Sequence, residues 1–269
     1  LESGYQVVVY DNLCNSSVES LSRVQKLTGK SVEFVEGDIQ ETNKLNDVFS
    51  NQQIDAVIHF AALKAVGEST QLPLSYYQNN VHGTVCLLEA MAKHNVTDFI
   101  FSSSATVYGE ENDIPYVETM KLGTPSSPYG ASKVMVERVM ADLAIADKNF
   151  RGVSLRYFNP IGAHESGQIG EDPKGIPNNL LPFVAQVAVG KREKLSIFGD
   201  NYPTKDGSCE RDYLHVMDLA EGHVAALDWL KGNSEFTGVE SFNLGTGTGT
   251  SVFDIVKAFE QATEVTIPF

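Results

Sequence analysis

The sequence has few residues of the kinds that cross-link a chain or coordinate a metal. It holds three cysteines in 269 residues, and Cys14, Cys86 and Cys209 are too widely and irregularly spaced for a disulfide framework or a cysteine metal site. His215 and His223 have no third ligand at metal-binding spacing, so we interpret both as structural and expect no metal. Thiols without partners favour a reducing compartment, and we therefore expect a cytoplasmic protein.

Basic residues and long apolar runs are also scarce. The chain has 20 Lys and Arg against 35 Asp and Glu, a formal net charge of −15. Affinity for nucleic acid comes from clustered Lys and Arg, so we expect no nucleic-acid partner. The apolar run from Leu180 to Val189 contains Pro182 and Gln186 and is too short to span a bilayer, so we expect no membrane partner.

What is present is an alternation of apolar runs and helical patterns. Strands are expected over 5–10, 32–36, 56–60, 99–102 and 153–157, and helices over 41–53, 74–94 and 129–146. Residues 1–4 are expected to form the last turn of a helix. This order predicts an α/β fold, a doubly wound, Rossmann-like parallel sheet with helices on both faces. Glycines and prolines after Asn159 predict a smaller substrate-binding lobe. Ligands of such sheets bind beyond the carboxyl ends of the strands.

The strongest chemical signal is the pair formed by Tyr129 and Lys133. Residues four apart lie on one helix face, and a nearby ammonium favours the phenolate and lowers the tyrosine pKa. Such a base can take a proton from a sugar hydroxyl and return it. A hydroxyl at the strand end from Ser102 to Ser104 could bind the same oxygen. The alternatives are a surface helix with unrelated side chains and a serine-rich turn. The combined layout is that of short-chain dehydrogenase sites.

Acidic residues follow the first two strands. Asp11 could accept both ribose hydroxyls of NAD and would repel the 2′-phosphate of NADP. Asp38, after Gly37, could bind the adenine amine. The alternative for both is an ordinary turn-forming aspartate.

Further candidates lie around the third strand. The small residues within Phe60–Lys64 would let the backbone approach a ligand, and Lys64 could neutralise a phosphate or be solvated. Asn79 and Asn80 are unfavourable inside a helix, so we expect one of them to have a buried partner and Asn79 to face the cofactor.

The later part of the chain offers one guanidinium and one glycine-rich segment. Arg211 could hold a diphosphate with its planar fork, or form a surface ion pair with Asp212 or Glu210. The segment Gly245–Gly249 lacks the Lys-Ser/Thr of a phosphate-binding loop. We interpret it as a turn after a strand.

Taken together, these residues resemble the UDP-glucose 4-epimerases of the extended short-chain dehydrogenase/reductase family. The likeness covers almost the whole chain. It is carried by Asp11 to Ser16, Val57 to Ser69, Ser102 to Gly109, Ser127 to Gly130, Arg156 to Ile161, Gly170 to Pro173, Ile176 to Leu180 and Arg211 to Asp218.

The resemblance implies interconversion of UDP-glucose and UDP-galactose through a transient 4-keto sugar, with tightly bound NAD, in a homodimer. Tyr129, Ser104 and Lys133 would be catalytic. The residues implied at NAD are Asp11, Asn12, Asn15, Ser16, Asp38, Ile39, Phe60, Ala61, Ala62, Lys64, Asn79, Tyr129, Lys133 and Phe158. Those implied at the UDP-sugar are Ser104, Asn159, Asn179, Leu180, Phe198, Arg211 and Tyr213.

The resemblance also predicts how the chain divides. Residues 1–159 would form the NAD-binding domain and 160–269 mainly the substrate-binding lobe, with 218–260 returning to the first domain. The family opens with a strand and a glycine loop that have no counterpart before Leu1, and it continues past Phe269. We therefore expect a sequence truncated at both ends, inactive by itself as an epimerase.

Three other functions compete with this interpretation. A sugar-nucleotide 4,6-dehydratase would need an acidic residue where Ala105, Thr106 and Val107 stand. An epimerase for UDP-N-acetylhexosamines or UDP-pentoses would share every motif described above. A non-catalytic NAD-binding regulator would have no need of intact Ser104 and Tyr129.

Overall fold

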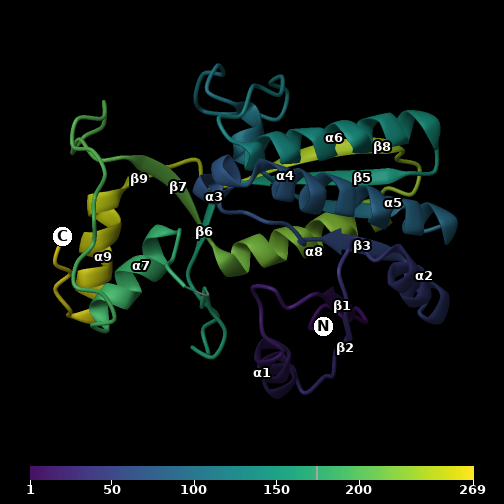
Figure 1. The fold of residues 1–269 in the computed structure, drawn as a ribbon, viewed down its shortest axis with the longest axis horizontal. Helices are drawn as coiled ribbons and strands as arrows, with labels where there is room; N and C mark the ends of the chain where they lie inside the picture. Colours follow the sequence, from purple (N-terminus) through teal and green to yellow (C-terminus); the bar gives the residue numbers. More distant parts are fainter. Residues whose placement is uncertain (174) are drawn as a thin grey trace. The chain divides into compact units, whose positions relative to one another are not determined.

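The computed structural model describes residues 1–173 and 175–269 and divides them into two compact units. Unit 1 comprises residues 1–157 and 220–244, and unit 2 comprises 158–219 and 245–269 (Figure 1). The chain thus returns to unit 1 over a shorter stretch than the expected 218–260, because the segment after Leu244 builds a strand and a helix of unit 2. Which unit binds which ligand stays a prediction.

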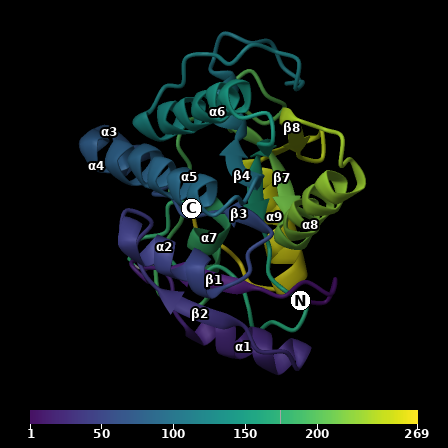
Figure 2. The same cartoon turned by 90° about the vertical axis from the view of Figure 1, so that its right-hand side faces the viewer.

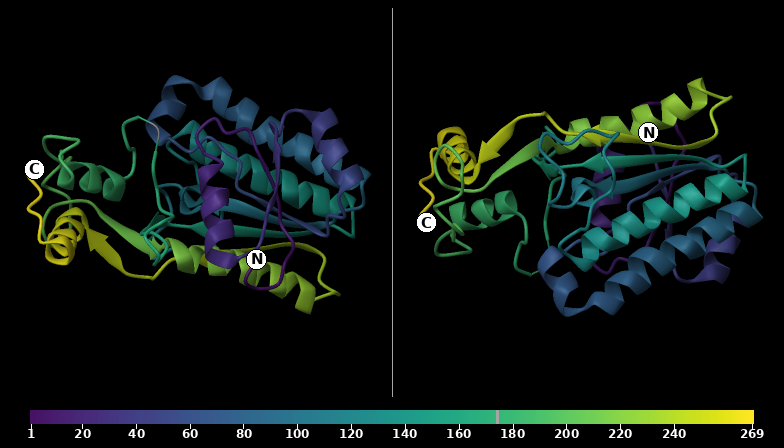
Figure 3. Two further views of the ribbon diagram at one scale, coloured as in Figure 1. Left: turned by 90° about the horizontal axis from the view of Figure 1, so that it is seen from below. Right: turned by 90° about the horizontal axis from the view of Figure 1, so that it is seen from above.

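The main sheet of unit 1 is parallel, with the order β3-β4-β5-β8. Helices α5 and α6 lie on one face and residues 220–232 of α8 on the other (Figures 2 and 3). The expected α/β fold with helices on both faces is confirmed. The elements are β3 (Ala56–His59), β4 (Asp98–Ser104), β5 (Arg151–Tyr157), β8 (Gly238–Leu244), α5 (Gly83–Lys93), α6 (Pro128–Ala146) and α8 (Val216–Gly232).

The sheet is apolar on both faces because both are covered. Phe99 and Phe101 of β4 pack on one side with Met91 and Met140 from the helices. On the other side Ile100 packs with residues of α8. Every residue of β4 is buried, which explains why its apolar run does not alternate with polar residues.

The amino-terminal part of unit 1 forms a second parallel sheet. It contains β1 (Val8–Asp11) and β2 (Glu33–Glu36), and α1 (Glu19–Thr28) connects them before α2 (Thr42–Asn51) follows. Within the described residues no ladder joins this pair to β3. The expected helix end at residues 1–4 is wrong. These residues form a turn in which the Gly4 amide donates to the Leu1 oxygen at 3.0 Å.

The single helix expected over 74–94 is also wrong in detail. After α3 (Val66–Gln71), the segment comprises α4 (Pro73–Tyr76), a π-helix η1 (Tyr77–His82) and α5. A π-turn holds an extra residue and changes the direction of the side chains on it, and such turns are frequent at functional sites. Here the π-helix contains both Asn79 and Asn80.

Unit 2 is a small mixed sheet with two helices. Its strand order is β6-β7-β9, parallel between β6 and β7 and antiparallel between β7 and β9. Apolar residues including Val184, Leu195 and Val256 form its core. The elements are β6 (Asn159–Ile161), β7 (Glu210–His215), β9 (Gly249–Ser251), α7 (Leu180–Ala188) and α9 (Val252–Thr263). Among the described helices of the chain, none has the length and apolar character that crossing a membrane requires.

Candidate active site

The first turns of α6 carry the tyrosine and the lysine that the sequence singles out. The helix begins at Pro128, and Ser127 is its N-cap, accepting from the Gly130 amide at 3.2 Å. Serine before a first-turn proline is a strong helix start. Lys133 is 4% exposed, and its Nζ donates to the main-chain oxygen of Ser102 at 2.7 Å. The same nitrogen lies 5.8 Å from the centroid of the Tyr129 ring.

Ser104 closes β4 beside these two residues. Its Oγ accepts from the amide of Thr106 at 3.3 Å and from the Thr106 hydroxyl at 3.1 Å. Through these bonds Ser104 is the N-cap of the 3₁₀ helix η2 (Ala105–Tyr108). Ser104 lies near enough to Tyr129 to act on the pKa of its phenol, lowering it against the larger, opposite effect of burial. The structure therefore places Ser104, Tyr129 and Lys133 together, at the carboxyl end of a parallel strand.

The acidity of the pair differs from the sequence expectation. Burial raises the pKa of Tyr129 above its ordinary range, the nearby Tyr157 acts in the same direction, and Ser104 offsets only part of the effect. Burial also lowers the pKa of Lys133 to about 7, against the opposing effect of Glu137. The expectation that Lys133 lowers the tyrosine pKa is thus wrong for this state of the protein, because burial disfavours both charged forms. Tyr129 is held here as a proton donor.

A buried asparagine ties the loop after β3 to α6. Asn80, 3% exposed, accepts from the Leu63 amide at 2.8 Å and donates to the Leu63 oxygen at 2.9 Å. It also donates to Ser132 Oγ at 3.0 Å, and Ser132 donates to the main-chain oxygen of Tyr129 at 2.6 Å. The expectation of one asparagine with a buried partner is confirmed, and it is Asn80. That Asn79 faces a cofactor stays a prediction.

The ends of β1 and β2 bring the two predicted nucleotide-binding aspartates close together. Asp11 Oδ1 accepts from the Leu13 amide and from Ser16 Oγ, both at 2.7 Å. Asp38 Oδ2 accepts from Asn12 Nδ2 at 2.8 Å. Burial acts to raise the pKa of Asp38, but hydrogen bonds from Gln40 and Asn12 bring it below the ordinary value. Both carboxylates therefore act as hydrogen-bond acceptors here, and the environment of Asp38 favours its ionised form.

Close packing at this edge requires glycine. A Cβ on Gly37 would lie 2.4 Å from the ring of Tyr10, whose hydroxyl donates to the Asp38 main-chain oxygen at 2.9 Å. Ile39 is buried, and a Cβ on Gly83 would meet its side chain at 2.5 Å.

The other predicted cofactor residues are more exposed. Phe60 is 55% exposed, and its ring lies tilted against that of His223, with the ring centroids 4.5 Å apart. The buried position of His223 agrees with a structural role. Ala61 and Ala62 are half-buried, and Asn15 and Lys64 are exposed. Phe158 lies in unit 2, directly before β6.

Unit 2 gathers three of the predicted substrate residues on one small sheet. Asn159 of β6 pairs with Tyr213 of β7, and Arg211 lies two residues earlier on β7, on the same face as Tyr213. Asn179 precedes α7, with its Nδ2 donating to Glu171 at 2.8 Å, and Leu180 is the first residue of that helix. Phe198 is 83% exposed on a loop.

Arg211 and the glycine-rich loop are held by different partners. Within the described residues, Arg211 forms no ion pair with an acidic side chain, and its Nη1 donates to the main-chain oxygen of Glu210 at 2.7 Å. The carboxylate of Asp212 instead accepts from the Thr246 amide at 2.9 Å and the Gly247 amide at 2.8 Å. The loop is thus held by an aspartate of the neighbouring strand β7, in agreement with its interpretation as a turn.

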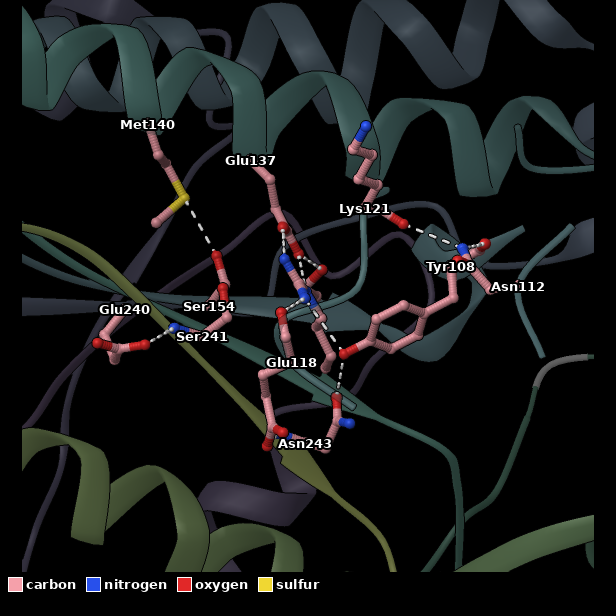
Figure 4. A network of polar contacts seen from close by, with 12 residues as sticks. Tyr108, Asn112, Glu118, Lys121, Glu137, Met140, Ser154, Glu240, Ser241 and Asn243 are labelled. Carbon is pink, nitrogen blue, oxygen red and sulfur yellow. Dashed lines mark hydrogen bonds and ion pairs between the residues drawn. The ribbon is translucent and has the colours of Figure 1, made fainter. Parts of the chain in front are cut away.

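One part of this region was not singled out from the sequence. Glu137 and Arg156 form an ion pair with an N–O distance of 2.6 Å, and their side chains are 5% and 6% exposed. Tyr108 and Asn243 extend it (Figure 4). Two features of the sequence could have indicated this ion pair. Glu137 follows Lys133 by one helical turn, and Arg156 interrupts an apolar strand, which requires a buried counter-charge.

Comparison with known proteins gives a consistent result. The model of the NAD dependent epimerase/dehydratase family matches residues 1–245. A UDP-glucose 4-epimerase of Erwinia amylovora is 59% identical over 269 residues, which is 100% of this chain and 79% of that protein. A crystal structure of UDP-glucose 4-epimerase from Bifidobacterium longum in complex with NAD+ and UDP is 50% identical, with a TM-score of 0.94, over 99% of this chain and 78% of that one.

A second solved structure agrees. It is a UDP-glucose-4-epimerase from Stenotrophomonas maltophila with bound NAD and formylated UDP-arabinopyranose, with a TM-score of 0.95 and 45% identity. The match covers 100% of this chain and 79% of the Stenotrophomonas chain. The extent of the family match and the identity of these relatives decide the assignment: this chain belongs to the NAD dependent epimerase/dehydratase family.

Proposed function

We propose that the protein is an NAD-dependent isomerase that interconverts UDP-glucose and UDP-galactose at the sugar C4. The observation that carries the proposal is the placement of Ser104, Tyr129 and Lys133 at one strand end. The names of its relatives, at 53–59% identity, support the same activity.

The chain's own residues supply the proton chemistry. In its phenolate form, which a protonated Lys133 favours, Tyr129 takes the proton of the 4-hydroxyl when the sugar is oxidised, and it returns that proton when the 4-keto group is reduced. Ser104 binds the same oxygen and holds it at the phenol. Lys133 lies beside the Tyr129 ring, and when protonated it favours the phenolate. When bound, NAD supplies the acceptor and later the donor of the hydride at C4.

The residues that follow β1 and β2 suit the adenosine half of such a cofactor. Asp11 binds its own loop through Oδ1, and among the described residues its Oδ2 has no hydrogen-bond donor. In this proposal that oxygen accepts the ribose hydroxyls. Asp38 and the neighbouring Asn12 and Ile39 offer acceptors and an apolar wall for the adenine. The exposed loop from Phe60 to Lys64, held by Asn80, and Asn79 would line the rest of the cofactor, with Asn15, Ser16 and Phe158 contributing.

Unit 2 provides the groups for the nucleotide half of the substrate. Arg211 has a guanidinium free of acidic partners in the described part of the chain, and a planar fork binds a diphosphate in bidentate fashion. Asn159 and Tyr213 lie on the same sheet as Arg211. Asn179, Leu180 and Phe198 would complete the contacts to the uridine and the sugar.

A second candidate substrate class has a specific observation in its favour. One solved relative holds formylated UDP-arabinopyranose, and another at 38% identity and a TM-score of 0.84 is described as a UDP-Glc/GlcNAc 4-epimerase. We therefore propose UDP-glucose and UDP-galactose as the main pair and UDP-N-acetylhexosamines or UDP-pentoses as the alternative. We further propose a homodimer located in the cytoplasm, the latter because its cysteines form no disulfide among the described residues.

The test is a conversion assay. The complete gene product is purified and incubated with UDP-galactose, UDP-N-acetylglucosamine or UDP-xylose, and the 4-epimers are separated by chromatography. Conversion of UDP-galactose, absent in Tyr129→Phe, is the expected result. Faster conversion of the N-acetylated or pentose substrate would show that the main substrate belongs to that class and not to the UDP-glucose and UDP-galactose pair. Binding of NAD without conversion of any substrate, and without a change at 340 nm, would indicate a regulator.

A further inference from the structure

Three consecutive residues of β4 contact three successive turns of α6. Ser104 lies near enough to Tyr129 to act on its pKa. The main-chain oxygen of Ser102 accepts from Lys133. The hydroxyl of Ser103 donates to Glu137 Oε1 at 2.6 Å. Glu137 thus occupies the third position of the helix face that carries the two catalytic side chains.

Both oxygens of the Glu137 carboxylate are used. Arg156 donates to Oε1 through Nε at 3.0 Å and to Oε2 through Nη2 at 2.6 Å. The remaining Nη1 of Arg156 donates to the Tyr108 hydroxyl at 3.2 Å (Figure 4). Burial acts to lower the pKa of Arg156, but its bonds to Glu137 outweigh burial and raise it. The Glu137 carboxylate therefore forms a buried ion pair with Arg156, one helical turn after Lys133 on α6.

The other groups that face Lys133 cannot replace this charge. From β4 it meets the Phe101 ring, at 4.8 Å from the centroid, and the Ser102 oxygen. From β3 it meets His59, which stays neutral because burial lowers its pKa to about 3. On α6 itself Tyr129 is protonated. Glu137 is the acidic group that opposes the effect of burial on Lys133.

We propose that Glu137 is a positioning residue of the candidate active site, which keeps the Lys133 ammonium protonated, and that Arg156 limits the strength of this effect. Glu137 touches neither substrate nor cofactor in this role. The kinetic consequence rests on the proposed function, whereas the protonation of Lys133 can be measured without it.

The proposal predicts effects of opposite sign for the two partners. Glu137→Gln keeps the shape but leaves two buried cations together, so Lys133 should lose its proton at a pH lower by about one unit. Arg156→Gln leaves the carboxylate to act on Lys133 alone, so the proton should be lost at a higher pH by a similar amount. A purely structural pair would give loss of stability in both variants and no opposed shifts.

The direct experiment is NMR titration of the lysine side chains in ¹³C,¹⁵N-lysine-labelled protein, with the Lys133 signal assigned by Lys133→Arg. The alkaline limb of the pH–rate profile for UDP-galactose is measured in parallel. A downward shift in Glu137→Gln and an upward shift in Arg156→Gln are the expected result. Equal titration of Lys133 in both variants and the wild type overturns the proposal. Opposed titrations in a protein without epimerase activity would refute only the proposed function.

Two further variants guard against loss of folding. Ser103→Ala removes the hydroxyl bond to Glu137 without changing any charge, so the titration of Lys133 should stay within about 0.3 unit of the wild type, a small fraction of the shift expected from removing a charge. Glu137→Met with Arg156→Met replaces the pair by apolar groups, which is often tolerated. Because Glu137 follows Lys133 by one helical turn and is the charged group that acts to raise its pKa, the double variant should still titrate below the wild type. An unchanged titration there also overturns the proposal.

Discussion

The Nζ atom of Lys133 lies 2.7 Å from the main-chain oxygen of Ser102 and 5.8 Å from the centroid of the Tyr129 ring. The lysine is therefore fixed to the end of β4 on one side and faces the proposed acid/base on the other. This relationship makes the role of Tyr129 testable, since the position of the ammonium does not depend on the phenol hydroxyl.

Tyr129→Phe should remove the transferable proton while leaving the ring and Lys133 in place. A positioned general acid/base contributes about 10²–10⁴-fold to rate, so turnover of UDP-galactose should fall by that factor with NAD still bound. Tyr116→Phe is a matched control, because its hydroxyl donates to Gly109 in a loop away from Lys133. A Tyr129→Phe protein with more than about a third of wild-type turnover would contradict a role worth at least 10²-fold.

The architecture of the site was accessible from the sequence because it depends on periodicity. Tyr129 and Lys133 are four residues apart on a regular helix, and Ser104 ends a strand that contains an apolar run, Phe99 to Phe101. The order of strands and helices was accessible for the same reason. Such patterns report which face of an element is buried.

Features that depend on three-dimensional contacts were not accessible. The π-helix at Tyr77–His82 follows from the bonds that Asn80 makes with Leu63 and Ser132, far away in sequence. The raised pKa of Tyr129 follows from burial, which a spacing rule does not measure. The ion pair of Glu137 and Arg156 joins residues from a helix and a strand, and the sequence shows the charges without their pairing.

Asp11 is predicted to select NAD over NADP. Asp11→Asn retains an acceptor for the Leu13 amide but removes the charge that would repel a 2′-phosphate. A charge-assisted hydrogen bond contributes about 1.5–3 kcal/mol, so the preference for NAD should fall by roughly ten- to a hundredfold. Calorimetry with both cofactors measures it, and the exposed Asp55→Asn is the control. If wild-type protein binds NADP as tightly as NAD, Asp11 does not have this role.

His59 is predicted to make the folded state sensitive to acid. The Thr84 hydroxyl donates to the Asn80 oxygen at 2.6 Å, so His59 Nε2 donates to Thr84 at 2.8 Å and the ring is neutral. Burial lowers the pKa of His59 from 6.5 to about 3. Above pH 6.5 the ring is neutral in both states. Between 6.5 and 3 the unfolded chain binds the proton more tightly, so stability is lost as pH falls.

The size of this loss can be measured by comparison with His59→Gln, whose amide can still donate to Thr84. Between pH 7.5 and 5 the free energy of unfolding should decrease by about 2 kcal/mol more in the wild type than in the variant. Urea unfolding at the two pH values supplies both numbers. An equal decrease in the two proteins would show that His59 titrates normally in the folded state.

Arg211 is predicted to bind the diphosphate of the substrate. Its guanidinium is exposed on β7 and, in the described residues, bonds only to the main-chain oxygen of Glu210. Loss of a charge-assisted bond to phosphate costs about 1.5–3 kcal/mol. Arg211→Ala should therefore weaken UDP binding by roughly ten- to a hundredfold. The acidity of the chain as a whole, a net charge of −15, makes a local cation more important for an anionic ligand.

The control for Arg211 lies in the same unit. Arg192 bonds to Gln186 at 2.7 Å and stacks on Phe183 at 4.7 Å, so its charge is already engaged in packing against α7. Arg192→Ala removes the same positive charge from unit 2, and UDP affinity measured by calorimetry should change by less than about threefold, because a distant surface charge is screened. Equal weakening in both variants would mean that net charge, not a bond from Arg211, determines UDP binding. Unchanged affinity in Arg211→Ala would exclude Arg211 from the site.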